Sequence, residues 1–273
     1  MCLGFMKNQH LPKLGFFFKG FPADVRFRRH SVPESLELVR GTLYEAWYRA
    51  VKNSPYMAQA IDEDVWRSKE QRNNFSNFGD LRGTTFDEWW VQVGYEIFKE
   101  PDGFKHIGIK ESSQTNDDQT LTIEVPLTVS PATLKAQFDQ LLKDKHPHYV
   151  QFDRWKFSEA QLKMRSSKLT SQSLNLYLDV YECWTALKSQ NPIAHLYEVG
   201  EKMKLNPRYT VNRNDFPEEV KEKHLQMSLT VTEYLGKAKN LIAYASEGIF
   251  PCTEDHEWIE RTERAANWRK RTD

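Results

Sequence analysis

The sequence has no excess of charge of either sign, because 38 Lys and Arg residues balance 38 Asp and Glu residues among its 273 positions. It therefore lacks the broad positive field of many nucleic-acid-binding proteins, and any contact with a polyanion must come from local patches. Cysteine is also scarce: Cys2, Cys183 and Cys252 are odd in number and far apart. This spacing excludes a disulfide framework and a paired-cysteine zinc site, and it fits a reducing compartment.

Long apolar runs are missing as well. The apolar N-terminus extends only from Met1 to Met6 before Lys7, which is too short for the core of a signal peptide. No other window approaches eighteen uncharged apolar residues. We therefore expect a cytoplasmic protein that makes no contact with a membrane.

The familiar spacings of catalytic and metal-binding residues are absent too. The twelve glycines form no phosphate-binding loop, and the sequence contains no Gly-x-Ser-x-Gly elbow. His146 and His148 are the only close histidine pair, and no cysteine or acid stands at a useful spacing to complete a metal site. The sequence therefore predicts no catalytic residue, no metal and no cofactor, and we do not expect an enzyme.

Aromatic residues, in contrast, are plentiful, with eight Trp and sixteen Phe. They supply the burial that offsets the chain entropy lost on folding. Apolar residues recur every three or four positions within 33–50, 84–98 and 130–142, which predicts helices there. Residues 107–110 and the alternating 121–125 predict a small β hairpin at about 104–126. We therefore expect a mainly α (α+β) protein whose N-terminal helical unit, residues 1–150, carries this hairpin.

Residues 151–273 are predicted to form a second, C-terminal unit that is a helical bundle. Apolar stripes follow capping residues near Ser171, Asn191 and Thr230, and Gly248 stands where a glycine often ends a helix. The connection between the two units is expected at about 145–170. The side chains expected to be largely buried across both units are Trp47, Phe86, Trp89 or Trp90, Phe98, Leu141, Trp184, Leu235 and Ile242.

Within the C-terminal unit, about residues 192–245, two segments form a recognisable pair. Tyr197–Leu205 contains a Glu-aliphatic-small core, and Ser228–Lys239 opens with Thr230 and Val231 and continues to lysines beside Ala238. This pair resembles the helix-turn-helix of sigma-factor and response-regulator output domains. Those families join the two helices by a few residues, whereas Asn206–Met227 intervenes here, with an extra helical turn expected from Pro217 to Leu225. This insert is either a loop that leaves the pair intact or a disruption of it.

The resemblance implies that the second helix reads duplex DNA. The residues implied at the major groove or its phosphates are Thr230, Thr232, Glu233, Lys237 and Asn240, with Lys239 on the phosphates and Arg208 and Arg213 of the insert beside the groove. The first hypothesis is accordingly a DNA-binding protein, such as a regulator, whose N-terminal unit dimerises or binds a partner.

The second hypothesis is a non-catalytic adaptor or subunit of a protein assembly, which binds another protein or itself. The surface around the second helix distinguishes the two hypotheses. A continuous positive face that joins Lys237, Lys239 and Arg208 or Arg213 favours DNA, and a mixed or acidic face favours the adaptor.

Overall fold

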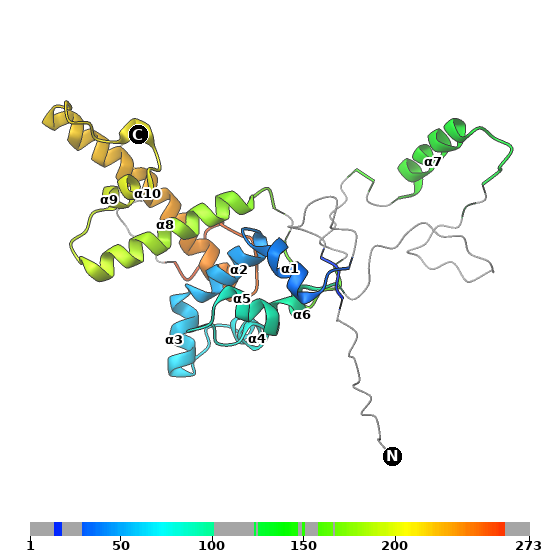
Figure 1. Cartoon of the computed structure of the whole chain (residues 1–273), viewed down its shortest axis with the longest axis horizontal. Helices are drawn as coiled ribbons and strands as arrows, with labels where there is room; N and C mark the ends of the chain where they lie inside the picture. The colour runs from blue at the N-terminus through cyan, green and yellow to red at the C-terminus, as the bar shows by residue number, and fades with distance from the viewer. Residues whose placement is uncertain are drawn as a thin grey trace, which may run out of the picture. The chain divides into compact units, whose positions relative to one another are not determined.

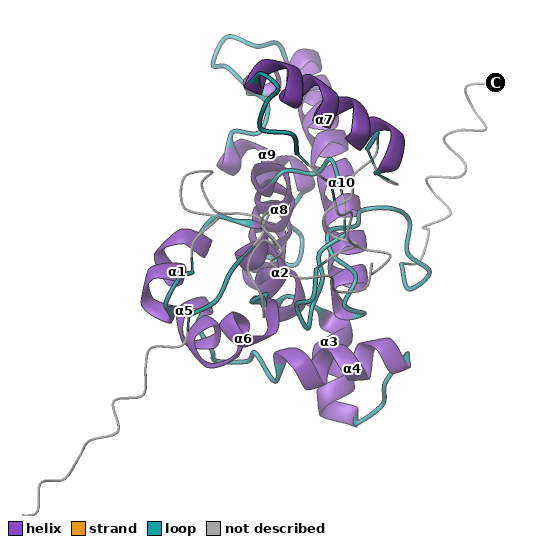
Figure 2. Ribbon diagram, turned by 90° about the vertical axis from the view of Figure 1, so that its right-hand side faces the viewer, coloured by secondary structure: helices purple, strands orange, loops and turns teal. Residues whose placement is uncertain are grey.

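The structure, a computed structural model, describes residues 14–17, 29–100, 123, 125–146, 149–150, 158–165 and 167–259 (Figure 1). Its contacts divide the chain into two compact units. Unit 1 comprises residues 1–103 and 158–273, and unit 2 comprises residues 104–157. The described part is mainly helical and contains no strand, only the isolated bridges Gly15–His30 and Phe16–Glu100 (Figure 2).

The helical elements of unit 1 are α1 (Val32–Val39), α2 (Leu43–Lys52), α3 (Pro55–Glu63), α4 (Lys69–Phe78), α5 (Phe86–Trp89), the π-helical turn η1 (Trp90–Gly94), α6 (Tyr95–Phe98), α8 (Ser171–Gln190), α9 (Leu196–Met203), the 3₁₀ turn η3 (Pro207–Tyr209) and α10 (Pro217–Ser246). In unit 2 the described helix is α7 (Pro131–Lys145). Capping explains several starts: Ser54, Ser68, Ser130 and Thr170 each accept a backbone N–H from the first turn of the helix that follows.

At the centre of unit 1, α2, α8 and α10 pack against one another (Figure 2). Arg49 of α2 reaches across to α8, where its guanidinium donates to Glu182 at 2.9 Å and to Asn175 at 3.0 Å. A third contact goes to Asp179. Since the Arg49 side chain is only 20% exposed, these charge-assisted bonds hold two helices that are far apart in the sequence.

An aromatic layer fills the space between α2, α4 and the continuous α5–η1–α6 rod. Trp47 stacks on Phe250 at 5.2 Å, and Phe78 stacks on Trp89 at 5.0 Å. The indole N–H of Trp89 donates to the Phe78 carbonyl, so this buried polar group is satisfied. A Cβ atom at Gly94 would lie within 2.8 Å of the rings of Trp89 and Trp90, so only glycine fits this turn of the rod.

Much of the predicted core is confirmed. The residues of that set with at most 9% exposure are Trp47, Phe86, Trp89, Trp90, Phe98, Leu235 and Ile242. Leu141 and Trp184 are only partly buried, so neither belongs to the fully buried core. Leu141 belongs to α7, which buries none of its residues, and Trp184 lies at the edge of its cluster beneath the ammonium of Lys188.

Other expectations need correction at the level of elements. The helix predicted over 33–50 is broken at Gly41, whose φ of 72° turns the chain between α1 and α2. The hairpin predicted at 104–126 falls on residues that lie largely outside the described ones, and its described residues 123, 125 and 126 form no strand. The division into 1–150 and 151–273 differs from the observed contacts, because α2 packs on α8 and α10 within one unit.

The two ends of unit 1 that flank unit 2 are joined to each other. Glu100, which is 4% exposed, accepts the hydroxyl of Ser158 and, at 2.7 Å, the backbone N–H of Glu159. The N–H of Leu162 donates to the carbonyl of Ile97 at 2.9 Å. Because these bonds hold residues 97–100 beside 158–162, the chain leaves unit 1 and re-enters it at one place.

Candidate interaction surface

The helix pair singled out in the sequence, α9 and α10, packs closely. A Cβ atom at Gly200 would lie 2.3 Å from Cγ of Met227, so α9 approaches α10 at the one position of α9 that has no side chain. Val199 of α9 and Val231 of α10 are fully buried in the same cluster. The predicted bundle of α8, α9 and α10 is therefore present in unit 1.

The predicted start of the second helix is wrong. Instead of opening near Thr230, α10 begins at Pro217 and runs without a break to Ser246. Proline suits the first helical position, and Glu219 accepts the N–H of Phe216 at 2.9 Å as a capping residue. Thr230 is an interior residue whose hydroxyl donates back to the carbonyl of Gln226. Half of the predicted insert, residues 217–227, is thus the first part of the helix itself.

The side chains predicted to read DNA do not gather on one free face. Asn240 is 9% exposed, and its carboxamide oxygen accepts the backbone N–H of His256 at 3.0 Å. Lys237 binds Glu233 at 2.6 Å and lies over the ring of Tyr177, and its hydrogen bond to Glu233 raises the pKa of the Lys237 ammonium. Thr232 and Lys239 are exposed, and the hydroxyl of Thr232 donates to the carbonyl of Ser228.

The two arginines of the set, Arg208 and Arg213, are exposed near the N-terminal end of α10. Arg208 lines a hollow of about 280 Å³ whose other walls include Glu219 and Glu222. From Gln226 of that hollow to Lys239 the helix rises by roughly 20 Å. The positive groups are therefore separated, and acidic side chains stand between them.

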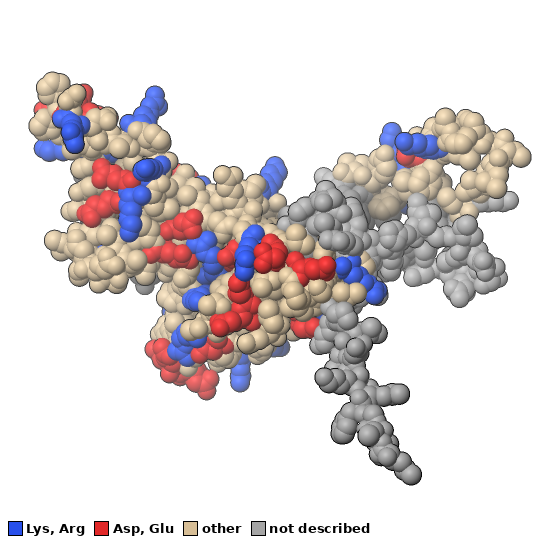
Figure 3. All heavy atoms as spheres, viewed as in Figure 1, with Lys and Arg blue, Asp and Glu red and all other residues tan. Residues whose placement is uncertain are grey.

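Acidic and basic side chains are interspersed over the visible face of unit 1 (Figure 3). No continuous basic strip is visible on that face of its described residues. We expected a mixed surface of this kind for a protein that binds other proteins and a continuous positive face for a protein that binds DNA.

A different set of residues stands out on the outward face of α10. Leu225 and Leu229 are one turn apart, and their side chains are 57% and 45% exposed. Their helix buries Met227, Val231 and Leu235 on the opposite side, so the outward leucines take no part in that packing. Hydrophobic side chains paired at i and i+4 on an exposed face are typical of a helix that packs against another helix. Sequence reasoning missed these leucines because it placed the helix start beyond Leu225.

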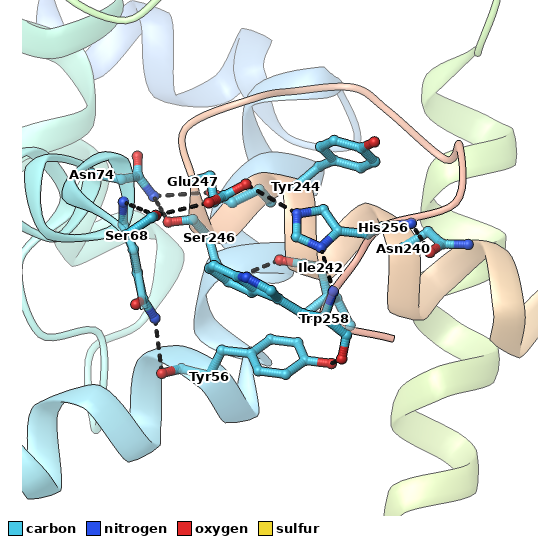
Figure 4. A network of polar contacts seen from close by, with 12 residues as sticks. Tyr56, Ser68, Asn74, Asn240, Ile242, Tyr244, Ser246, Glu247, His256 and Trp258 are labelled. Carbon is cyan, nitrogen blue, oxygen red and sulfur yellow. Dashed lines mark hydrogen bonds and ion pairs between the residues drawn. The ribbon is translucent and has the colours of Figure 1, made fainter. Parts of the chain in front are cut away.

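The C-terminal segment, residues 251–259, covers the same side of α10 nearer its end (Figure 4). The backbone N–H of Trp258 donates to Nδ1 of His256 at 3.1 Å, which makes Nδ1 an acceptor. Nε2 then carries the proton and donates to Glu247 at 3.0 Å. The ring of Tyr244 meets the His256 ring edge to face at 4.5 Å. The outward face of α10 is thus closed from Asn240 onward and open before it.

The end of α10 is tied to α4 by the same network. Gly248, with φ of 76°, lets the N–H of Ile249 reach the carbonyl of Tyr244, as the predicted glycine cap requires. Asn74 of α4 donates to the carbonyls of Ala245 and Ser246 at 2.9 and 3.2 Å, which satisfies two groups that every helix end exposes. This end of α10 is therefore held firmly while its other end carries the exposed leucines.

The network does not have the arrangement of a catalytic site. Ser68 donates to Glu247 at 2.7 Å and not to His256, so no imidazole is placed to take a proton from the hydroxyl. The described residues also contain no group of three or more His, Cys, Asp or Glu side chains that could hold a metal ion. None of the described helices is both long and apolar enough to cross a bilayer. The described network is an internal clamp.

Unit 2 carries an apolar surface of its own. Leu134, Phe138 and Leu141 follow one face of α7, and none of them is buried. Together with Ile123 and Val125 they line a groove of about 500 Å³. A groove of mainly apolar lining on a helix face is a common recognition surface for a protein segment.

Comparisons of the chain with protein-family models, with curated proteins and with solved structures find no match.

Proposed function

We propose that the protein is a non-catalytic adaptor or subunit of a protein assembly, and that it binds through the outward face of α10. The observation that carries this proposal is the exposure of Leu225 and Leu229 on a helix that buries Met227, Val231 and Leu235 on its other side. Removing such side chains from water is the main source of affinity at protein interfaces. The apolar groove on α7 supports the same role, since an adaptor needs more than one surface.

Site-specific photo-crosslinking tests the adaptor proposal. A photoreactive residue in place of Leu229 in the full chain should give a discrete adduct in the source cell. The same residue at Val65, which is 62% exposed in unit 1, is the matched control and should give none. The adduct should disappear when Leu225 is also changed to Glu, because a charge there opposes apolar docking. An equal yield of adducts at both positions would contradict the proposal.

Duplex-DNA binding is the second candidate, and the exposure of Arg208, Arg213, Thr232 and Lys239 is the observation that favours it. Fluorescence anisotropy with random duplex DNA at about 100 mM salt separates the two functions, because non-specific binders reach roughly 0.1 mM to micromolar affinity. The adaptor proposal expects no salt-dependent binding at tens of micromolar protein. If binding occurs and Lys239→Ala lowers the salt slope by about 1, DNA binding replaces the adaptor as the first choice.

A further inference from the structure

Seven residues at alternating spacings of four and three follow the outward face of α10. They fall into two sets in which successive members are seven residues apart. The first set is Glu218, Leu225, Thr232 and Lys239, and the second is Glu222, Leu229 and Gly236. Positions seven apart on an α-helix differ by only about 20° in direction, so each set lies on one line along the helix. In coiled coils two such lines form the seam where they carry apolar residues, and on α10 Leu225 and Leu229 are the apolar pair of these lines. The seam from residue 218 to residue 239 is roughly 32 Å long.

Gly236 is unusual on this seam. A glycine inside a helix costs about 1 kcal/mol relative to alanine. At position 200 the close approach of Met227 explains why a glycine is present despite this cost. At position 236 a Cβ atom would meet nothing within 4 Å. No contact within the described residues therefore requires glycine at position 236. A second helix that approaches closely from outside would require it, since the missing side chain lets two backbones come together.

The charges at the two ends of the seam determine which helix fits. Glu218 at its start and Lys239 at its end are exposed, and neither forms an ion pair with another described residue. A copy of α10 laid parallel would place Glu218 on Glu218 and Lys239 on Lys239. A copy laid antiparallel, about a two-fold axis between Ser228 and Leu229, brings Glu218 to the partner's Lys239 at both ends. Leu229 of each copy then lies beside the axis, and Leu225 lies one turn away, opposite Thr232 of the other copy.

We infer that the outward face of α10 binds a second copy of this chain in an antiparallel, two-fold symmetric contact. This inference rests on the proposed function and names the partner at that surface. A two-fold interface is self-complementary, so a single seam supplies both halves of it. The C-terminal segment limits the contact at Asn240, one residue beyond Lys239.

Sedimentation velocity on the purified full chain, from about 1 to 200 micromolar, tests the pairing. One seam of this length is a small interface, so association is expected in the micromolar range. The sedimenting mass should rise from 32.2 kDa toward twice that value. Changing both Leu225 and Leu229 to Glu should leave a monomer, and changing Val65 to Glu, at a similarly exposed position, should leave the association intact.

A charge exchange identifies the orientation. Glu218→Lys alone and Lys239→Glu alone should each weaken the association about tenfold, because two symmetry-related attractions become repulsions. The double variant restores both pairs with their signs reversed, so its association should return to the level of the unmodified chain. Both positions changed in these variants are exposed, and circular dichroism should report the same helix content throughout.

The possible outcomes are distinct for the inference and for the proposed function. A monomer at 200 micromolar, or a dimer that survives the two Leu→Glu changes, overturns the second-copy inference. If the photoreactive residue at position 229 still gives an adduct with another protein that Leu225→Glu abolishes, the adaptor proposal stands without self-pairing. If the charge-exchanged double variant associates more weakly than either single variant, the antiparallel arrangement is wrong and the inference with it.

Discussion

Gly200 of α9 and Gly236 of α10 lie inside neighbouring helices, and we expect a Gly→Ala substitution to have opposite effects on stability at the two positions. At Gly200 a new methyl group would lie 2.3 Å from Cγ and 2.4 Å from Sδ of Met227, a side chain with no exposure. Overpacking of a core costs about 1–3 kcal/mol. The better helix propensity of alanine returns up to about 1 kcal/mol. Gly200→Ala should therefore lower the free energy of unfolding by about 1–2 kcal/mol.

Gly236→Ala introduces the same methyl group where nothing lies within 4 Å. Only the helix-propensity and chain-entropy terms remain, so this variant should be about 0.5–1 kcal/mol more stable than the unmodified chain. Urea unfolding followed by circular dichroism, at a protein concentration below the association range, measures both changes. In the self-associated protein, the same methyl group should weaken pairing, because it fills the space that the second helix needs.

A double-mutant cycle with Met227→Ala checks the physical reason. Shortening Met227 removes the atoms that the methyl group at position 200 would meet, so the penalty of Gly200→Ala should largely vanish in that background. Gly236→Ala should add independently, since it touches neither residue. The close approach of α9 to α10 is refuted if Gly200→Ala is neutral or stabilising in the unmodified chain.

Three further outcomes are expected. Leu235→Ala, at a site 6% exposed, should cost about 2–5 kcal/mol in urea unfolding, and a loss under roughly 0.5 kcal/mol would contradict its burial. Burial, together with Glu88, raises the pKa of Tyr48 to about 12, so its contribution to stability is complete below pH 10 and is lost as the pH rises toward 12. In Tyr48→Phe the free energy of unfolding should fall less steeply between pH 10 and 12. An unchanged slope would contradict the assignment of this loss to Tyr48. Replacing residues 104–157 by a short Gly-Ser linker should leave the unfolding transition of unit 1 in place, because Glu100 and Ser158 already join the flanking ends.

The long amphipathic helices were predictable because their apolar spacing and caps agree. Ser130 begins α7 and Gly248 ends α10 as the sequence predicted, and the cap of α8 is Thr170, one position before the predicted Ser171. α4 was missed for a physical reason: two of its three buried residues, Gln71 and Asn74, are polar and bind backbone groups of other segments. Hydrophobic periodicity has no signal for such a helix.

The start of α10 shows where a family pattern misleads. Pro217 followed by Glu219 has the composition of a helix start, but the resemblance placed the start of the long helix near Thr230 and left Pro217–Leu225 as a separate turn within an insert. Once α10 begins at Pro217, Leu225 and Leu229 become helical neighbours, and they can be seen to lie on the same outward face as Glu218 and Lys239. The sequence contains this signal, but it depends on the correct helix boundary.

Because α10 has a packed side and an open side, mutations can separate its role in folding from its role in binding. Val231 and Leu235 hold the helix in the bundle, and the clamp at Glu247 and His256 holds its end, so changes there alter folding and binding together. Leu225 and Leu229 contribute little to that packing, since about half of each side chain is in contact with solvent. A Leu→Glu change at these two positions leaves the core intact and removes the apolar seam. Loss of binding without loss of stability is therefore the specific signature of this surface.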